Sequence, residues 1–113
     1  PYPEITPEAA RAAGAALAAD GRSGSNLLCF PRFWRGTLDA RAKKINYDMY
    51  KAASLAIVGA TGEGELVPSS LDSKVHLAVT HAVAKAAVES GVAQRQLDDD
   101  YFASTDVREP PWA

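Results

Sequence analysis

The chain has 113 residues, of which 47% are hydrophobic and 23% charged, and its formal net charge is −2. This length fits one compact core, and the composition matches soluble globular domains and excludes a disordered chain. The weak negative charge provides no global attraction to nucleic acid or anionic lipid, and no stretch reaches about 18 apolar residues. A single cysteine, Cys29, forms no internal disulfide. We therefore expect a soluble cytoplasmic protein without a nucleic-acid or membrane partner.

A short helix is predicted from Pro7 to about Gly14. Thr6 is suited to cap it, and Pro7 fits the first helical position because its missing N–H needs no partner there. The alanine-rich residues 15–19 that follow have no clear period. A continued helix and a short buried strand both remain open for these residues, and we favour the strand.

The next segment, residues 30–42, is predicted to form an amphipathic helix. Its large apolar residues recur at three- and four-residue steps and are expected on one buried stripe: Phe30, Phe33, Trp34, Leu38 and Ala42. Arg35, Asp39 and Lys43 stand four apart on the opposite face, where each ion pair contributes about 0.2–0.5 kcal/mol. The basic residues of this segment are thus explained as a solvated helix face rather than as a phosphate-binding patch.

Two further helices are predicted in the second half of the chain. Asn46 caps the first, which Gly59 ends, and Asp72 caps the second, which ends at Gly91. Residues 59–71 contain three glycines and a proline without a period, which is typical of a loop. The buried faces are expected at Met49, Ala52, Ala53, Ala56 and Ile57 in the first helix, and at Val75, Val79, Val83 and Ala86 in the second.

No catalytic or metal-binding constellation emerges from residue spacing alone. His76 and His81 are five residues apart, which places them about 140° apart around one helix, so they do not form a metal pair. The acidic run 98–100 is expected to be a solvated stretch or a helix cap. No glycine-rich phosphate loop and no nucleophile elbow are present.

Several segments in order resemble the C-terminal part of bacterial malic enzymes. They are "PYPEITPEAARAAGAALAADGRS", "NLLCFPRFWRGTLDARAKKINYDMYKAASLAI" and "KVHLAVTHAVAKAAVESGVAQRQLDD". The family pattern runs approximately N-P-x-P-E-I, A-T-G-R-S-D-x-P-N-Q-x-N-N, F-P-G with a following G-A-L-D, and a helix ending in E-S-G-V-A. The resemblance covers nearly everything from Pro3 to about Asp99.

The resemblance implies a reaction and one substrate-binding residue. The family oxidatively decarboxylates malate to pyruvate with NAD or NADP and a divalent ion, Mg or Mn. Its acid–base residues, metal ligands and dinucleotide loop belong to earlier parts of the enzyme, so no catalytic, cofactor or metal residue is assigned here. Asn26 matches the last asparagine of N-Q-x-N-N, whose amide helps hold the malate carboxylate. Loop contacts are expected from Gly21, Arg22, Ser23 and Arg32, although the loop is shortened and Arg32 replaces the glycine of F-P-G.

We therefore expect a mainly α, compact chain of four or five helices with one short strand, corresponding to the C-terminal part of a Rossmann-containing α/β enzyme. Residues 1–113 form a single domain or fragment: 1–26 a remnant of the nucleotide-domain edge, 27–97 a helical region and 98–113 a tail laid on a neighbour. The expected function is a malic-enzyme-related fragment that is not catalytic on its own. The alternatives are a stand-alone helical oligomerisation or interaction module, and a small-carboxylate binder. The expected partners are a second copy or the remainder of a malic enzyme.

Overall fold

The computed structural model describes residues 4–18, 25–69 and 71–105, without the side chains of residues 25–27. Its helices are α1 (Pro7–Ala12), α2 (Ser25–Asp39), α3 (Tyr47–Gly59), α4 (Ser73–Glu89) and α5 (Asp99–Ala103). The expected mainly α fold is confirmed.

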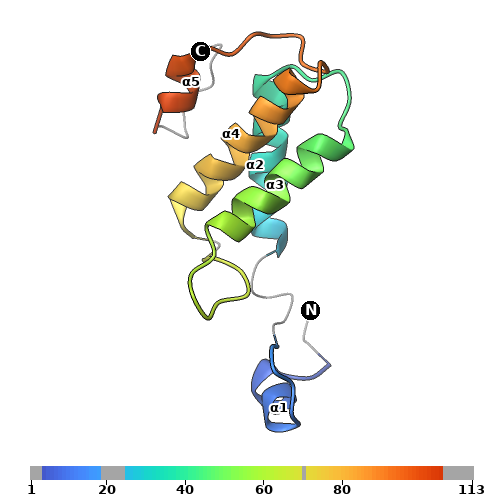
Figure 1. The fold of residues 1–113 in the computed structure, drawn as a ribbon, viewed down its shortest axis with the longest axis vertical. Helices are drawn as coiled ribbons and strands as arrows, with labels where there is room; N and C mark the ends of the chain where they lie inside the picture. The colour runs from blue at the N-terminus through green and yellow to red at the C-terminus, as the bar shows by residue number, and fades with distance from the viewer. Residues whose placement is uncertain (1–3, 19–24, 70, 106–113) are drawn as a thin grey trace.

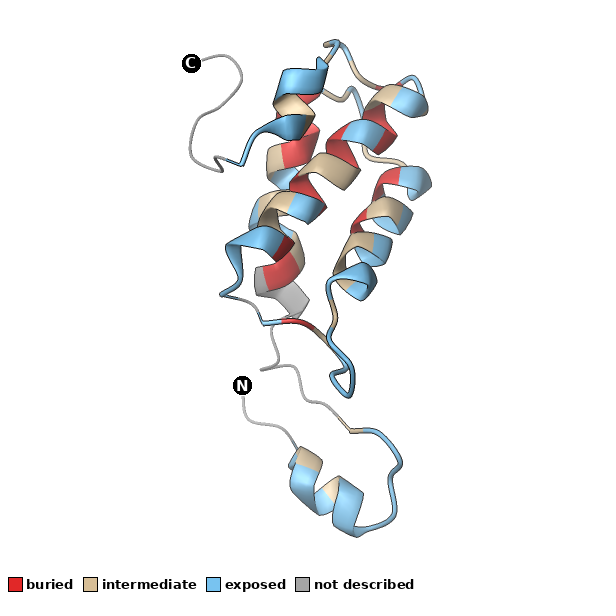
Figure 2. Ribbon diagram, turned by 60° about the vertical axis from the view of Figure 1, so that its left-hand side comes forward, coloured by how far each residue is buried: buried red, intermediate tan, exposed pale blue. Residues whose placement is uncertain are grey.

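Helix α4 is the centre of the molecule. It packs against both α2 and α3, whereas α2 and α3 contact each other much less (Figure 1). The buried core combines Phe33, Met49 and the valine stripe of α4, centred on Val79 and Val83. Helix α1 contributes no buried residue and lies apart from this three-helix core (Figure 2).

A glycine sets the spacing between α2 and α4. An ideal Cβ atom built on Gly36 would lie 2.4 Å from the carbonyl oxygen of Thr80 and 3.0 Å from Cβ of Val83. Both distances are shorter than ordinary van der Waals contact, and the first involves backbone. The two helix backbones can therefore approach this closely only because residue 36 has no side chain.

The helix boundaries follow the local signals in the sequence. The side chains of Thr6, Asn46 and Asp72 accept hydrogen bonds from backbone N–H groups in the first turns of α1, α3 and α4, at 3.2, 3.1 and 2.9 Å. Gly14 and Gly91 follow their helices with φ of 103° and 75°, a left-handed conformation that glycine adopts without strain. The predicted caps and stops are confirmed.

The strand expected over residues 15–19 is wrong for the part that the structure describes. Residues 15–18 are neither strand nor helix, and residue 19 lies outside the described residues. A strand needs a neighbouring strand to pair its N–H and C=O groups. The described residues offer none, so an extended alanine run gains nothing from that conformation.

The buried stripe expected on α2 is also wrong in its direction. Phe33 is buried as predicted, but Phe30, Trp34 and Leu38 are exposed. The buried arc is instead centred on Gly36 and Ala40, where the backbone lies closest to α4. Trp34 and Leu38 project about 160° away from Gly36 around the helix. The face of α2 that packs closely on α4 therefore consists of small residues, and the large apolar residues Phe30, Trp34 and Leu38 lie in solvent.

Candidate functional site

The sequence-predicted substrate loop is described only in part. Gly21, Arg22 and Ser23 lie outside the described residues. Asn26 belongs to the first turn of α2, but its side chain lies outside the described part of the chain. Of the predicted contacts, only Arg32 has a described side chain, so its proximity to the others remains a prediction.

Arg32 lies in α2 on the side that approaches α4. Its side chain is half-buried, and its Nε atom is buried without a hydrogen-bond partner among the described residues. Its carbonyl oxygen lies 3.4 Å from Oγ1 of Thr80 on α4. Unpartnered buried N–H groups are rare in folded proteins because they lose their hydration without compensation. Nε of Arg32 is therefore an unsatisfied buried donor within the described part of the chain.

A second polar centre, which the sequence analysis missed, surrounds Asp39 at the end of α2. The Asp39 side chain is fully buried, and Nε of Arg35 donates to both carboxylate oxygens at 2.8 Å. The hydroxyl of Tyr101, 62 positions further along the chain, donates to Oδ2 at 2.7 Å. The predicted Arg35–Asp39 ion pair is present. It was expected on the exposed helix face, but the Asp39 carboxylate is buried and the Arg35 side chain is 21% exposed. Lys43 is exposed, as expected.

Helix α5 is fastened to the bundle at this buried carboxylate. The ring of His81 on α4 lies 5.2 Å from that of Tyr101 and 5.8 Å from that of Phe102, between ring centroids. Burial lowers the pKa of His81, and the charge of Asp39 acts in the opposite direction. Asp98 caps α5 by accepting from the N–H of Tyr101, which confirms the capping role expected for the acidic run. The described part of the tail thus packs on its own chain.

The Tyr101 anchor predicts loss of stability at high pH. Burial and the hydrogen bond to Asp39 raise the pKa of Tyr101 well above its ordinary value of 10.0. Above pH 10 the Tyr101 hydroxyl loses its proton in the unfolded chain but keeps it in the folded chain, so the free energy of unfolding falls as the pH rises. Well below pH 10 the hydroxyl is protonated in both states, so Tyr101 adds no pH dependence to the free energy of unfolding. We expect denaturation curves recorded on both sides of pH 10 to show this decrease.

The variant Tyr101→Phe separates this effect from general alkaline sensitivity. It has no phenol at position 101, so we expect lower stability than the parent at neutral pH but a weaker decline at high pH. Equal declines for the parent and the variant would contradict the assignment of the pH dependence to Tyr101.

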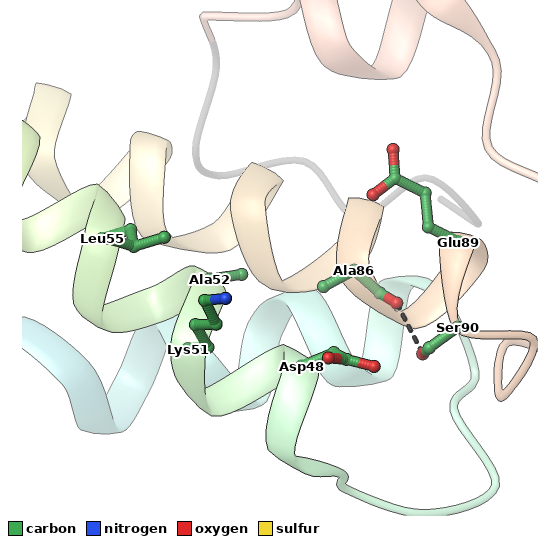
Figure 3. Close-up of a pocket in the computed structure, with 7 residues that line it drawn as sticks. All are labelled: Asp48, Lys51, Ala52, Leu55, Ala86, Glu89 and Ser90. Carbon is green, nitrogen blue, oxygen red and sulfur yellow. Dashed lines mark hydrogen bonds between the residues drawn. The ribbon is translucent and has the colours of Figure 1, made fainter.

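A groove of about 340 Å³ lies between α3 and α4, away from Arg32 and Asp39 (Figure 3). Its lining consists of Asp48, Lys51, Ala52, Leu55, Ala86, Glu89 and Ser90. Oγ of Ser90 donates to the carbonyl of Ala86 at 2.6 Å and accepts from Nδ2 of Asn46 at 2.8 Å. Both hydrogen bonds of the Ser90 hydroxyl therefore stabilise the junction between α3 and α4.

The described residues do not fit a divalent metal. They contain no group of three or more His, Cys, Asp or Glu side chains placed to hold one ion. His76 and His81 are both half-buried, as expected for histidines on a packed helix. Burial raises the pKa of the half-buried Cys29 thiol, which disfavours its reactive thiolate form. No helix in the described part of the chain is long and apolar enough to span a bilayer.

Comparison with known proteins identifies relatives that align with most of the chain. No family model and no solved structure matches the chain. It is 57% identical over 88 residues to "NAD-dependent malic enzyme 1" of Bacillus subtilis, an alignment that covers 78% of this chain and 20% of that protein. It is 45% identical over 113 aligned positions to the "Bifunctional malic/malolactic enzyme" of the same species, covering 91% of this chain and 28% of the relative.

A third relative carries the other cofactor in its name. The chain is 38% identical over 124 aligned positions to the "NADP-dependent malic enzyme" of Haemophilus influenzae, an alignment that covers 88% of this chain and 16% of that protein. The chain thus spans less than a third of the length of each of these three relatives. With most of its length aligned to them, the chain belongs to the malic enzyme family, in which it corresponds to a C-terminal portion.

Proposed function

We propose that this chain supplies the C-terminal helical portion of a malic enzyme and is not catalytic on its own. The reaction in which it would take part is the oxidative decarboxylation of malate to pyruvate. The observation that carries the proposal is its 57% identity to an NAD-dependent malic enzyme over 88 residues, which make up only 20% of that enzyme. We assign the binding of NAD or NADP, the binding of Mg or Mn, and the acid–base residues to the other four fifths of such an enzyme.

Within this assembly we assign different roles to parts of the chain. Residues 1–26 would form the edge of the nucleotide domain, residues 27–97 the helical region and residues 98–113 the tail. Asn26 would donate its amide to a malate carboxylate, beside loop contacts from Gly21, Arg22 and Ser23. An amide suits this task because it binds an anion without adding charge.

Complementation tests the proposal directly. A form of the Bacillus subtilis NAD-dependent malic enzyme 1 without its matching segment is mixed with this chain, and complex formation is followed by size-exclusion chromatography. We expect malate-dependent NADH formation in the complex and none with either component alone. A co-eluting complex without activity would overturn the proposal, and activity of the isolated chain would overturn its non-catalytic part.

A stand-alone cytoplasmic interaction module is the second candidate function. Its support is the group of large apolar side chains that α2 and α3 expose, because soluble monomers rarely expose contiguous apolar patches of this kind. In this role the chain would act as a homo-oligomer and would bind neither malate nor NAD. A stable folded oligomer without affinity for either compound would distinguish it from the first candidate.

Binding of a small carboxylate is a third candidate, supported by the buried and unpartnered Nε of Arg32. Together with Arg22 and Asn26, this donor would hold malate or pyruvate. We expect malate to raise the melting temperature of the chain by several degrees at millimolar concentration, because a ligand that binds only the folded state stabilises it.

Paired substitutions of arginine test this site. Arg32→Gln is expected to abolish the shift caused by malate, whereas Arg41→Gln, which removes an exposed guanidinium just beyond α2, leaves it intact. Asn26→Ala should reduce the shift. If all three variants respond to malate like the parent, the site is assigned wrongly.

A further inference from the structure

Residues 96–105, which we call the strap, are attached to the bundle through their side chains. Among the described residues, the last backbone N–H groups that reach the bundle are those of Gln94 and Arg95, which donate to the carbonyl of Ala40 at 3.1 and 3.3 Å. Within the strap, Ser104 donates its N–H to carbonyls of α5 itself. Figure 1 shows α5 beside α4, at the end of the segment that leaves the upper end of that helix.

The strap is fastened by one hydrogen bond and by ring contacts. The hydroxyl of Tyr101 donates to the buried Asp39 at 2.7 Å, and the rings of Tyr101 and Phe102 lie against that of His81. Helix α5 has no buried residue, whereas α4 has seven. The apolar side chains of the strap, Leu97, Tyr101 and Phe102, are half-buried. Segments with few buried apolar contacts open at a lower free energy than the core.

Opening of the strap leaves the Asp39 carboxylate with its other partner. Nε of Arg35 donates to both oxygens of Asp39 at 2.8 Å, and both residues belong to α2. This pair stays in place when Tyr101 leaves, and water replaces the phenol hydroxyl. Losing one hydrogen bond that water replaces costs less than leaving a buried charge without a partner. Helix α5 has five residues, too few to persist alone in water, so it unfolds as it leaves the bundle.

We propose that the strap detaches from the bundle and unfolds while α2, α3 and α4 stay folded, and that the hydrogen bond between Tyr101 and Asp39 is its fastening. The open state presents the Arg35–Asp39 pair and the ring of His81 to solvent. The strap is thus a reversible cover over a charged pair. This inference does not depend on the enzymatic proposal.

Limited proteolysis with chymotrypsin measures this opening in the full-length chain. The protease takes an aromatic ring into its specificity pocket, so it cuts after Tyr101 or Phe102 only when these rings have left the bundle. Phe33 is buried in the core, and a cut there requires the core to unfold. Mass spectrometry identifies each cut, and its rate is divided by that of a synthetic peptide with the same local sequence. When opening and closing are fast relative to cleavage, this normalised rate follows the population of the open state.

The two cutting sites are expected to differ in rate and in their response to urea. We expect the normalised cut after Tyr101 to be at least about a hundredfold faster than that after Phe33. Urea should accelerate the first cut weakly and the second steeply, because opening of the strap exposes much less surface than unfolding of the bundle. Equal normalised rates, or equal urea dependence, would mean that the strap opens only together with the bundle and would overturn the proposal.

Tyr101→Phe tests the fastening, because it removes the hydroxyl and keeps a ring that the protease accepts. We expect the normalised cut after residue 101 to become at least about tenfold faster, because a hydrogen bond to a charged acceptor is lost. Tyr47→Phe is the matched control: Tyr47 is 77% exposed at the start of α3, and its replacement should leave this rate unchanged. Circular dichroism verifies that both variants are folded. A Tyr101→Phe variant that is cut at the rate of the parent would overturn the assignment of the fastening to Tyr101.

Discussion

Replacing Asp39 with asparagine is expected to lower the free energy of unfolding by about 3 kcal/mol, the lower end of the range for breaking a buried ion pair. The carboxylate accepts from both Arg35 and Tyr101, whereas an amide of the same size has one acceptor oxygen and turns its NH₂ group toward the other donor. The Arg35 side chain retains 21% exposure, so water partly compensates for its lost partner.

Urea denaturation followed by circular dichroism measures this loss as a lower midpoint with an unchanged slope. All samples are compared at one protein concentration, because association would stabilise the folded state by mass action. Asp48→Asn is the matched control, since Asp48 is exposed in the first turn of α3, and its effect should be below about 1 kcal/mol. A similar small effect at Asp39 would show that the buried cluster contributes little to stability.

Replacing Gly36 with alanine is the second substitution with a large expected effect. The added methyl group would lie 2.4 Å from the carbonyl oxygen of Thr80, so the backbones of α2 and α4 must move apart at this point. Overpacking of this kind costs about 1–3 kcal/mol, and alanine's better helix propensity returns about 1 kcal/mol. We expect a net loss of about 2 kcal/mol, because the clash involves backbone rather than a flexible side chain.

Gly59→Ala is the control for helix propensity. Gly59 is the last residue of α3, and a Cβ atom there meets nothing within 4 Å. Its replacement should leave the free energy of unfolding unchanged or raise it by up to about 1 kcal/mol. The two Gly→Ala substitutions are thus expected to have opposite signs in thermal or urea denaturation. Equal effects would mean that α2 and α4 do not need a glycine at their crossing.

These two residues belong to the segment Gly36–Asp39, which matches the G-A-L-D part of the family pattern. Gly36 permits the close packing of α2 on α4, and Asp39 holds α5 through Tyr101. Both contacts stabilise the arrangement that keeps Arg32 beside α4. Packing and anchoring within this chain therefore explain the segment.

The helices and their ends can be predicted from local sequence. Caps such as Asn46 and Asp72 and stops such as Gly91 act within one turn of their own position, so local sequence carries the information. Short motifs that occur in the same order as in malic enzymes likewise indicated the resemblance, and the relatives confirm it. The buried faces of α3 and α4 also followed from their periodicity.

The buried face of α2 and the hydrogen-bond partners of Asp39 depend instead on how the helices pack together. Periodicity placed the large apolar residues on one helix face. It carries no information about α4, which packs against the small residues Gly36 and Ala40 instead. The hydrogen bond between Tyr101 and Asp39 joins residues 62 positions apart, and no local pattern encodes such a contact. Helix ends depend on neighbours in sequence, whereas burial and buried charge depend on neighbours in space.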